Sequence, residues 1–165
     1  MKLGKSLGSY TARGIVTEEF TRAGKPDRIR LFDGTFETAY VVKEFYAIPV
    51  DFSGANQPDF VLKLATSPNI AHNTALFCDP SDSREIAWAG CVGSNGSWAD
   101  QASAVDPDNM VVEDLWIYAN NVTVDETTPC GYMIVMEKFE ITDTQGAIAM
   151  SRDRANEPEP EWTFR

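Results

Sequence analysis

The chain has 165 residues, of which 43% are hydrophobic and 11% aromatic, and its formal net charge at pH 7 is −11. This length is typical of one domain with one core, and the hydrophobic and aromatic content excludes a disordered tail. No apolar run reaches the roughly 18–20 residues that a membrane-spanning helix needs. The length also excludes a two-domain nucleotide enzyme or a barrel of alternating strands and helices.

The first 50 residues are expected to be extended, as an arm followed by strands. Residues 1–27 are rich in Gly, Ser and Thr with scattered apolar residues, which predicts an extended N-terminal arm. Residues 28–32 then alternate as a strand, and Asp33-Gly34 predicts a tight hairpin turn. The β-branched and aromatic residues over 35–50 predict the next strand.

The middle of the chain predicts further strands and one long loop. Residues 60–66 alternate as a half-buried strand, a shorter strand is expected over 73–78, and we favour a strand over a short helix for 83–91. Residues 93–109 show no periodicity and predict a loop. Loops longer than about 12–15 residues usually have a function or make contacts.

Two clear strands and a helix are expected in the last third, and a polar connection separates the strands. The strands cover residues 110–119 and 132–141. Thr142 and Gln145 have the spacing of a capping box, which predicts a short helix over the residues that follow, 146–152.

These elements predict an all-β fold, a β-sandwich of the single jelly-roll type with one short C-terminal helix. The expected organisation is an extended arm at 1–27, a sandwich domain at 28–156 and an extended tail at 157–165. A double jelly roll would need about twice this length.

The charges are unevenly distributed. Residues 1–30 carry seven basic and three acidic side chains, whereas residues 31–165 carry seven basic and 22 acidic ones. An acidic body repels phosphate backbones, so nucleic-acid binding across the whole surface is not expected. The basic segment 1–30 has two candidate partners, which are a genome and the acidic body of a neighbouring copy.

Candidate contact residues lie mainly toward the two ends. Trp98 lies in the predicted loop 93–109, and an aromatic side chain in a polar loop is a candidate contact anchor. The tail carries two aromatic residues that are costly to leave in water. The predicted subunit contacts are Trp98, Trp162, Phe164, Arg13, Arg22 and Lys25.

Two acidic clusters and three cysteines are the candidates for metal and thiol chemistry. Acidic residues cluster at two turns, and they are candidate ligands for Ca²⁺ as well as ordinary solvated acids: Asp79 and Asp82 with Glu85, and Asp106 with Asp108. No other cofactor is expected. The three cysteines, Cys78, Cys91 and Cys130, are odd in number and lack close pairs, so neither a disulfide framework nor a zinc site is predicted. Cys78 and Cys91 are expected to pack as hydrophobic side chains.

Catalytic patterns are equally sparse. The single histidine, His72, has neither a legible nucleophile nor an orienting acid, so a triad is not predicted. Glu113 with Glu137 or Glu140 is the carboxylate pair that a glycosidase would use. Because carboxylates on the solvent faces of strands are ordinary, and no triad is legible, no enzyme activity is expected.

The C-terminal part of the sequence resembles a known family. Residues 111–121 read VVEDLWIYANN and residues 131–155 read GYMIVMEKFEITDTQGAIAMSRDRA. These segments resemble the C-terminal part of single jelly-roll major capsid proteins of tailless or environmental phages. The resemblance covers about a quarter of the chain. It implies trimers or pseudo-hexamers that assemble into a shell.

We therefore expect a capsid or other virion structural protein that self-assembles through homotypic contacts. Copies of itself are the expected partners, together with other virion proteins. The start of the chain lacks the apolar stretch of a signal peptide, so synthesis in the host cytoplasm and location in the virion are expected. The alternative from another class is a carbohydrate-binding or receptor-binding β-sandwich with a site at Trp98, and a glycosidase-type hydrolase ranks behind it.

Overall fold

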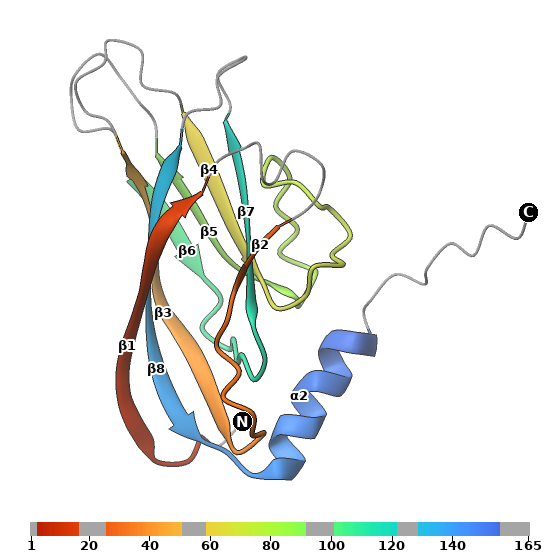
Figure 1. Cartoon of the computed structure of the whole chain (residues 1–165). Coiled ribbons are helices and arrows are strands. Elements are labelled where there is room, and N and C mark those ends of the chain that lie inside the picture. Colours follow the sequence, from red (N-terminus) through yellow and green to blue (C-terminus); the bar gives the residue numbers. More distant parts are fainter. Residues whose placement is uncertain (1–2, 17–25, 51–58, 92–100, 122–128, 156–165) are drawn as a thin grey trace, which may run out of the picture.

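The computed structural model is a two-layer β-sandwich with a helix at one end (Figure 1). Within the part of the chain that it describes, eight strands form two antiparallel sheets. The predicted all-β sandwich is thereby confirmed. The described residues are 3–16, 26–50, 59–91, 101–121 and 129–155.

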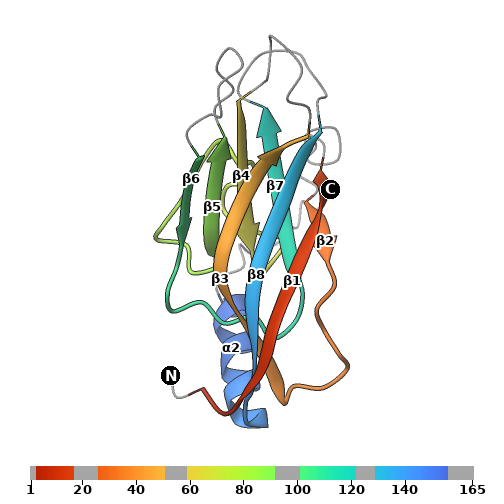
Figure 2. The same cartoon turned by 90° about the vertical axis from the view of Figure 1, so that its left-hand side faces the viewer.

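The smaller sheet has three strands in the order β1-β8-β3. These are β1 (Ser6–Val16), β8 (Cys130–Glu140) and β3 (Thr38–Pro49), and β8 pairs along its whole length with both neighbours. Figure 2 shows this sheet in front, with β1 at its outer edge. The register of β1 shifts between Ser6 and Gly8, and Gly8 has a φ of 115°, which favours glycine.

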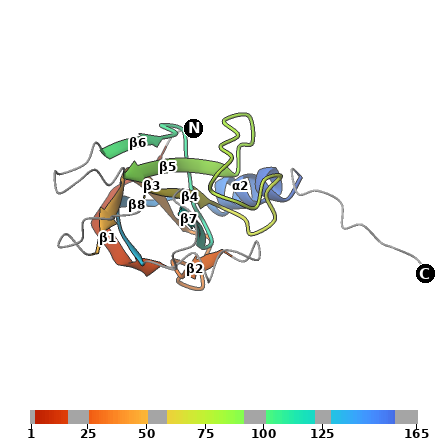
Figure 3. The same cartoon turned by 90° about the horizontal axis from the view of Figure 1, so that it is seen from above.

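The larger sheet has five strands in the order β2-β7-β4-β5-β6. Its two edges are short, since β2 covers three residues and β6 five. The strands are β2 (Asp27–Ile29), β7 (Leu115–Asn121), β4 (Phe60–Ala65), β5 (Glu85–Cys91) and β6 (Gln101–Val105). Seen from above, the two sheets face each other (Figure 3).

The core lies between the two sheets and uses the inward faces of both. Phe45 and Ile134 of the smaller sheet pack in one cluster with Leu62, Leu64 and Ile117 of the larger sheet, and all five are buried. Burial of each such side chain stabilises the fold by roughly 1.5–3 kcal/mol. The core therefore fixes which face of each strand points outward.

The helix α2 (Asp143–Ala155) begins where the sequence predicts a helix start. The Gln145 amide N–H donates to Thr142 Oγ1 at 3.3 Å, and the Thr142 N–H donates to Gln145 Oε1 at 3.2 Å. This reciprocal capping box satisfies amide groups that the first helical turn leaves unpaired. Ala149 packs in a small cluster with Val112 and Ile141, so the helix closes one end of the sandwich.

Most predicted strands are present. The predictions over 35–50, 60–66, 83–91 and 132–141 correspond to β3, β4, β5 and β8. The strand predicted over 110–119 is confirmed only for its second half, because β7 begins at Leu115.

Two segments that we predicted as irregular are strands instead. Residues 6–16, part of the predicted arm 1–27, form β1, because they pair with β8 residue by residue. Residues 101–105 of the predicted loop 93–109 form β6, which pairs with β5. In both cases the hydrogen bonds of a neighbouring strand, rather than apolar periodicity, determine the structure.

Two predictions of local structure are wrong. Residues 73–78 are not a strand; they belong to a loop that side chains of the larger sheet hold in place. Asp33-Gly34 does not close a hairpin, because β2 pairs with β7 and β3 pairs with β8 in the other sheet. The Asp33 carboxylate instead accepts hydrogen bonds from Thr35, Thr38 and Lys138.

Candidate functional site

The outer face of the larger sheet is covered by the 66–84 loop, which joins β4 to β5. A buried ion pair lies beneath this loop: Lys63 Nζ is 2.7 Å from Glu85 Oε1, and both side chains are 0% exposed. Lys63 Nζ also donates to the carbonyl oxygens of His72 at 2.7 Å and Phe77 at 2.8 Å. All three ammonium donors are therefore used, and two of them hold the loop backbone.

The Glu85 carboxylate is equally well satisfied on its other oxygen. Glu85 Oε2 accepts hydrogen bonds from the Asp79 N–H at 2.9 Å and from Trp88 Nε1 at 3.1 Å. A buried charge is tolerated only when it is paired and hydrogen-bonded. This network therefore ties the loop to β4 and β5 and positions Trp88.

A second buried pair holds the other part of the loop. The Arg84 guanidinium donates to both oxygens of Asp82, at 2.8 and 2.7 Å, and to the Asn69 carbonyl. Burial raises the pKa of Asp82, but the hydrogen bonds from Arg84 and from the Ala71 amide outweigh it and leave this pKa below its usual value of 3.8. Asp82 is therefore ionised at neutral pH and fixes the turn.

Strand β7 provides a third attachment. Tyr118 Oη donates to the Pro68 carbonyl at 2.8 Å, and burial raises the pKa of this phenol. Asn120 Oδ1 accepts hydrogen bonds from Thr74 Oγ1 at 3.0 Å and from the Ala75 N–H at 2.7 Å. Side chains of three neighbouring strands thus hold the loop against the sheet.

The anchored loop presents an apolar tip to solvent, which we define as Leu76 and Phe77. Leu76 is 54% exposed and Phe77 is 62% exposed, although the backbone on either side of them is hydrogen-bonded to buried side chains. The His72 ring lies 5.6 Å from the Phe77 ring. A fixed, exposed aromatic residue is a candidate contact anchor. Sequence reasoning missed this tip, because it assigned these residues to a strand.

Strand β1 is a second exposed surface. Leu7, Tyr10 and Ile15 are exposed apolar side chains on this one strand, and Arg13 is its only charged residue. Arg13, a predicted subunit contact, is therefore located on an accessible edge of the sandwich.

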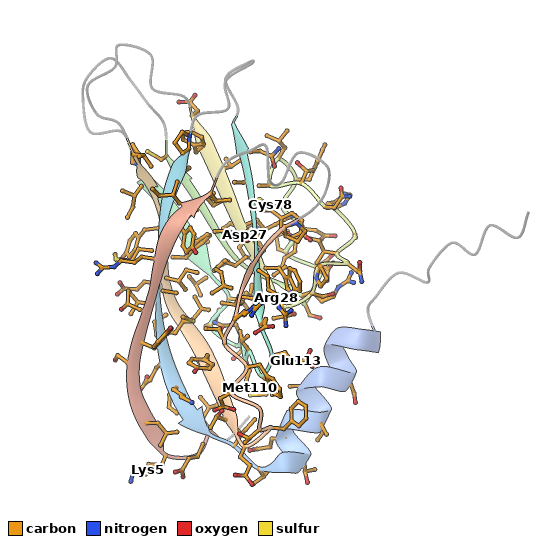
Figure 4. All side chains as sticks on the ribbon, in the orientation of Figure 1. Lys5, Asp27, Arg28, Cys78, Met110 and Glu113 are labelled. Atoms are coloured by element: carbon orange, nitrogen blue, oxygen red, sulfur yellow. The ribbon has the colours of Figure 1, made fainter. Side chains whose placement is uncertain are left out.

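A basic residue and an aromatic residue meet on the outer side of the β2-β7 pair. The Arg28 guanidinium lies 5.6 Å from the centroid of the Trp116 ring, and Arg28 Nε donates to Asp114 Oδ2 at 2.6 Å. Asp114 Oδ1 also accepts hydrogen bonds from the backbone N–H groups of Leu31 and Phe32. Burial raises the pKa of Asp114, but these hydrogen bonds outweigh it and hold the pKa below its usual range. Figure 4 labels Asp27 and Arg28 on β2, and Cys78 on the 66–84 loop.

The predicted metal ligands are not assembled into one site. Glu85 is paired with Lys63, Asp82 is paired with Arg84, and Asp79 Oδ1 accepts hydrogen bonds from Ser81. Asp106 Oδ1 accepts the Asp108 amide in a local turn. Among the described residues, no group of three or more His, Cys, Asp or Glu side chains is arranged to hold a metal ion.

A pocket lies beside the second acidic turn, with a volume of about 360 Å³. Lys43 and Asp108 contribute charged groups to it, and Val41 and Met110 contribute apolar surface. The nearby Asn109 is buried, and its amide bonds the Val42 backbone and the Asp106 carbonyl. Asn109 therefore fixes the turn that forms one wall.

The residues considered for a catalytic alternative are found in several parts of the fold. Glu113 precedes β7 rather than lying in a strand, whereas Glu137 is on β8 and accepts a hydrogen bond from Ser6 Oγ at 2.6 Å. Glu140 is the last residue of β8. His72 is exposed on the 66–84 loop, and its ring lies 5.6 Å from the Phe77 ring.

The three cysteines are free, and two of them are buried. Burial raises the pKa of Cys130 to about 12 and also raises that of Cys91, so both behave as apolar side chains. The prediction that Cys78 packs as a hydrophobe is wrong, because this residue is exposed beside the loop tip. The predicted contact residues Arg22, Lys25, Trp98, Trp162 and Phe164 lie outside the described residues.

Comparison of the chain with protein-family models, curated proteins and solved structures finds no match. Within the described ranges, no helix has the length and apolar character needed to cross a membrane.

Proposed function

We propose that this chain is a virion structural protein, a capsid subunit built on a single jelly roll that assembles into a shell through contacts between its own copies. The observation that carries the proposal is the order of the strands in the two sheets. Jelly rolls of eight strands are a recurrent architecture of viral capsid domains, and also of lectins and cupins.

The strand order fits the way in which a jelly roll forms. A long hairpin of eight strands pairs the first strand with the last, the second with the seventh, and so on inward. Wrapping this hairpin into two sheets gives the orders 1-8-3-6 and 2-7-4-5. The observed orders are β1-β8-β3 and β2-β7-β4-β5-β6, so seven strands match and β6 pairs with β5 instead of β3.

Exposed apolar side chains support assembly through homotypic contacts. Leu7, Tyr10 and Ile15 are exposed on β1, and Leu76 and Phe77 are exposed at the loop tip. Large apolar side chains at fixed, accessible positions are the usual anchors of protein–protein interfaces. The two surfaces belong to opposite outer parts of the sandwich, so one subunit has the means to contact more than one neighbour.

The proposal places the chain in the virion after synthesis in the host cytoplasm, with other virion proteins as further partners. The basic residues near the start of the chain are the part suited to a genome contact. The proposal assigns no catalytic step to any residue.

Electron microscopy of negatively stained, purified protein tests this function. We expect rings or shells from the wild-type chain and their loss in a Leu76→Ser/Phe77→Ser variant, because the loop tip no longer offers an apolar contact. Ile148→Ser is the matched control, since it removes an exposed apolar side chain on α2. A wild-type chain that remains a small, uniform particle at high concentration would contradict the proposal.

A further inference from the structure

Strand β1 differs from every other sheet edge in the described part of the chain. It is the end strand of the smaller sheet, it has 11 residues, and no described strand pairs with its outer side. Natural proteins usually block such edges with short strands, Lys or Pro residues, bulges or covering segments, because an open edge recruits another strand. The other edges of this sandwich carry these devices, and most of β1 does not.

The opposite edge of the same sheet, β3, is thoroughly blocked. The Tyr40 N–H and carbonyl both bond the Val111 backbone at 2.8 Å, and the Asn109 side chain bonds both the N–H and the carbonyl of Val42. A bulge follows between Val42 and Glu44, and the strand ends at Pro49. In the larger sheet, the edge strands β2 and β6 are only three and five residues long.

Strand β1 is regular beyond its initial bulge. Residues from Gly8 to Val16 pair in unbroken register with Lys138 to Cys130, and the segment contains no Pro, Lys, Asp or Glu. Its one charge is Arg13, which is exposed. Figure 2 shows the strand running along the outer side of the sheet. The edge that is open is thus also regularly paired and almost uncharged.

From this contrast we propose that the outer edge of β1 pairs with β1 of a second copy, antiparallel, so that two three-stranded sheets join into one six-stranded sheet. The inference deepens the proposed function by naming one contact between copies, and it rests on that self-association. Backbone hydrogen bonds between the two strands supply the affinity, as in other cases of strand addition.

The side chains distinguish the registers centred on the middle of the strand. Ala12 packs against the core and Val16 is buried, so from Gly8 onward even-numbered residues lie on the inner face and odd-numbered residues on the outer face. Tyr10 follows this pattern, since its ring contacts the buried Tyr40, although it is 49% exposed. A two-fold axis perpendicular to the sheet then aligns residues of the same parity. An axis at Arg13 would place two arginines directly opposite each other, which is unfavourable. An axis at Thr11 would draw the bulged residues into the pairing.

An axis at Ala12 avoids both problems. It uses the regular run from Gly8 to Val16 and no residue before it. In this register Thr11 of one copy faces Arg13 of the second copy, on the outer side of the joined sheet, and this pair occurs twice by symmetry. The register therefore makes the dimer sensitive to the sign of a charge at position 11.

Sedimentation equilibrium of the full chain tests this register with two variants of one residue. We expect Thr11→Glu to tighten the dimer and Thr11→Lys to weaken it, each by roughly 2- to 30-fold, since two symmetric cross-strand charge pairs change together. The double variant Thr11→Lys/Arg13→Glu restores a favourable pair and is expected to recover dimerisation. Circular dichroism verifies that each variant is folded.

The matched controls are Ser151→Glu and Ser151→Lys on the exposed face of α2, which make the same changes in net charge. Because the chain carries −11, a general charge effect would make Lys favour association and Glu oppose it, the reverse of the β1 prediction. Thr11 variants that behave like their Ser151 counterparts would overturn the β1 pairing. If such variants still form shells, the pairing is wrong and the proposed function stands; a wild type that neither dimerises nor forms particles overturns both.

Discussion

Each sheet carries a Lys–Glu pair on its outer face, with the two residues on adjacent strands, and the two pairs are in opposite environments. Lys63 and Glu85 on the larger sheet are wholly buried beneath the 66–84 loop, and both charged groups have further hydrogen bonds. Lys43 and Glu137 on the smaller sheet are 3.8 Å apart and remain in contact with water, with Lys43 47% exposed. Equivalent residue types thus have different roles.

The two pairs differ in how much they contribute to stability. Exposed pairs contribute about 0–1 kcal/mol, whereas loss of one partner from a buried pair costs about 3–5 kcal/mol. The buried pair therefore fixes a loop without regular structure and holds its apolar tip in place. The smaller sheet needs no such device, and its outer face and β1 edge remain accessible.

The largest expected effect is at the buried pair. Lys63→Met leaves the Glu85 carboxylate buried without its cation and removes the donors to the His72 and Phe77 carbonyls. We expect the free energy of unfolding to fall by about 3–5 kcal/mol, measured by urea denaturation. Lys63→Met/Glu85→Met is expected to recover part of this loss. Additive effects of the two changes would contradict a coupled pair.

The second prediction uses pH to isolate the contribution of the Asp82–Arg84 ion pair to the free energy of unfolding. At neutral pH, Asp82→Asn is expected to cost about 1.5–3 kcal/mol, because hydrogen bonds to a charged group are lost. The pKa of Asp82 is lowered in the folded state, so its contribution is complete above the unfolded value of 3.8 and is lost as the pH falls through the folded value.

The difference in stability between wild type and Asp82→Asn should therefore shrink below about pH 4. Thermal denaturation across pH 2–7 provides the measurement. A difference that stays constant down to the lowest pH would show that the carboxylate charge contributes nothing.

A smaller effect is expected at the β7 attachment of the loop. Tyr118→Phe removes one hydrogen bond to the Pro68 carbonyl and is expected to cost about 0.5–1.5 kcal/mol. Hydrogen exchange should show faster exchange at Ala71 and Ala75 in the loop and no change in β8. Uniformly faster exchange throughout the sandwich would mean that the bond supports the whole fold rather than the loop.

The smallest effect is expected at the exposed pair. Lys43→Met removes the partner of Glu137 and should change the free energy of unfolding by about 0–1 kcal/mol in urea. High salt should reduce even this difference, since exposed charges are screened. A loss comparable to that of Lys63→Met would erase the distinction between the two faces.

The sequence predicts those parts of the fold whose local signals agree with their packing. The β-branched and aromatic residues around Phe45, the alternation at Leu62 and Leu64, and the capping box at Thr142 each have a local physical cause, and the structure contains them. In these segments intrinsic propensity, burial and hydrogen bonding all favour the same local structure.

The parts that sequence reasoning missed depend on distant partners. Strand β1 has little apolar periodicity and forms through pairing with β8, more than 100 residues later in the chain. The 66–84 loop depends on Lys63, which the alternating pattern assigns to a strand without revealing that its ammonium is buried. The exposed position of the apolar tip depends on the buried Lys63 ammonium, so the sequence pattern did not predict the tip either.

The central claim, that the chain associates with its own copies, is tested most directly by sedimentation velocity of the purified wild-type protein over a rising concentration series. We expect a shift from a slowly sedimenting species to dimers and then to large particles. A single species with the mass of one chain at every concentration would contradict it.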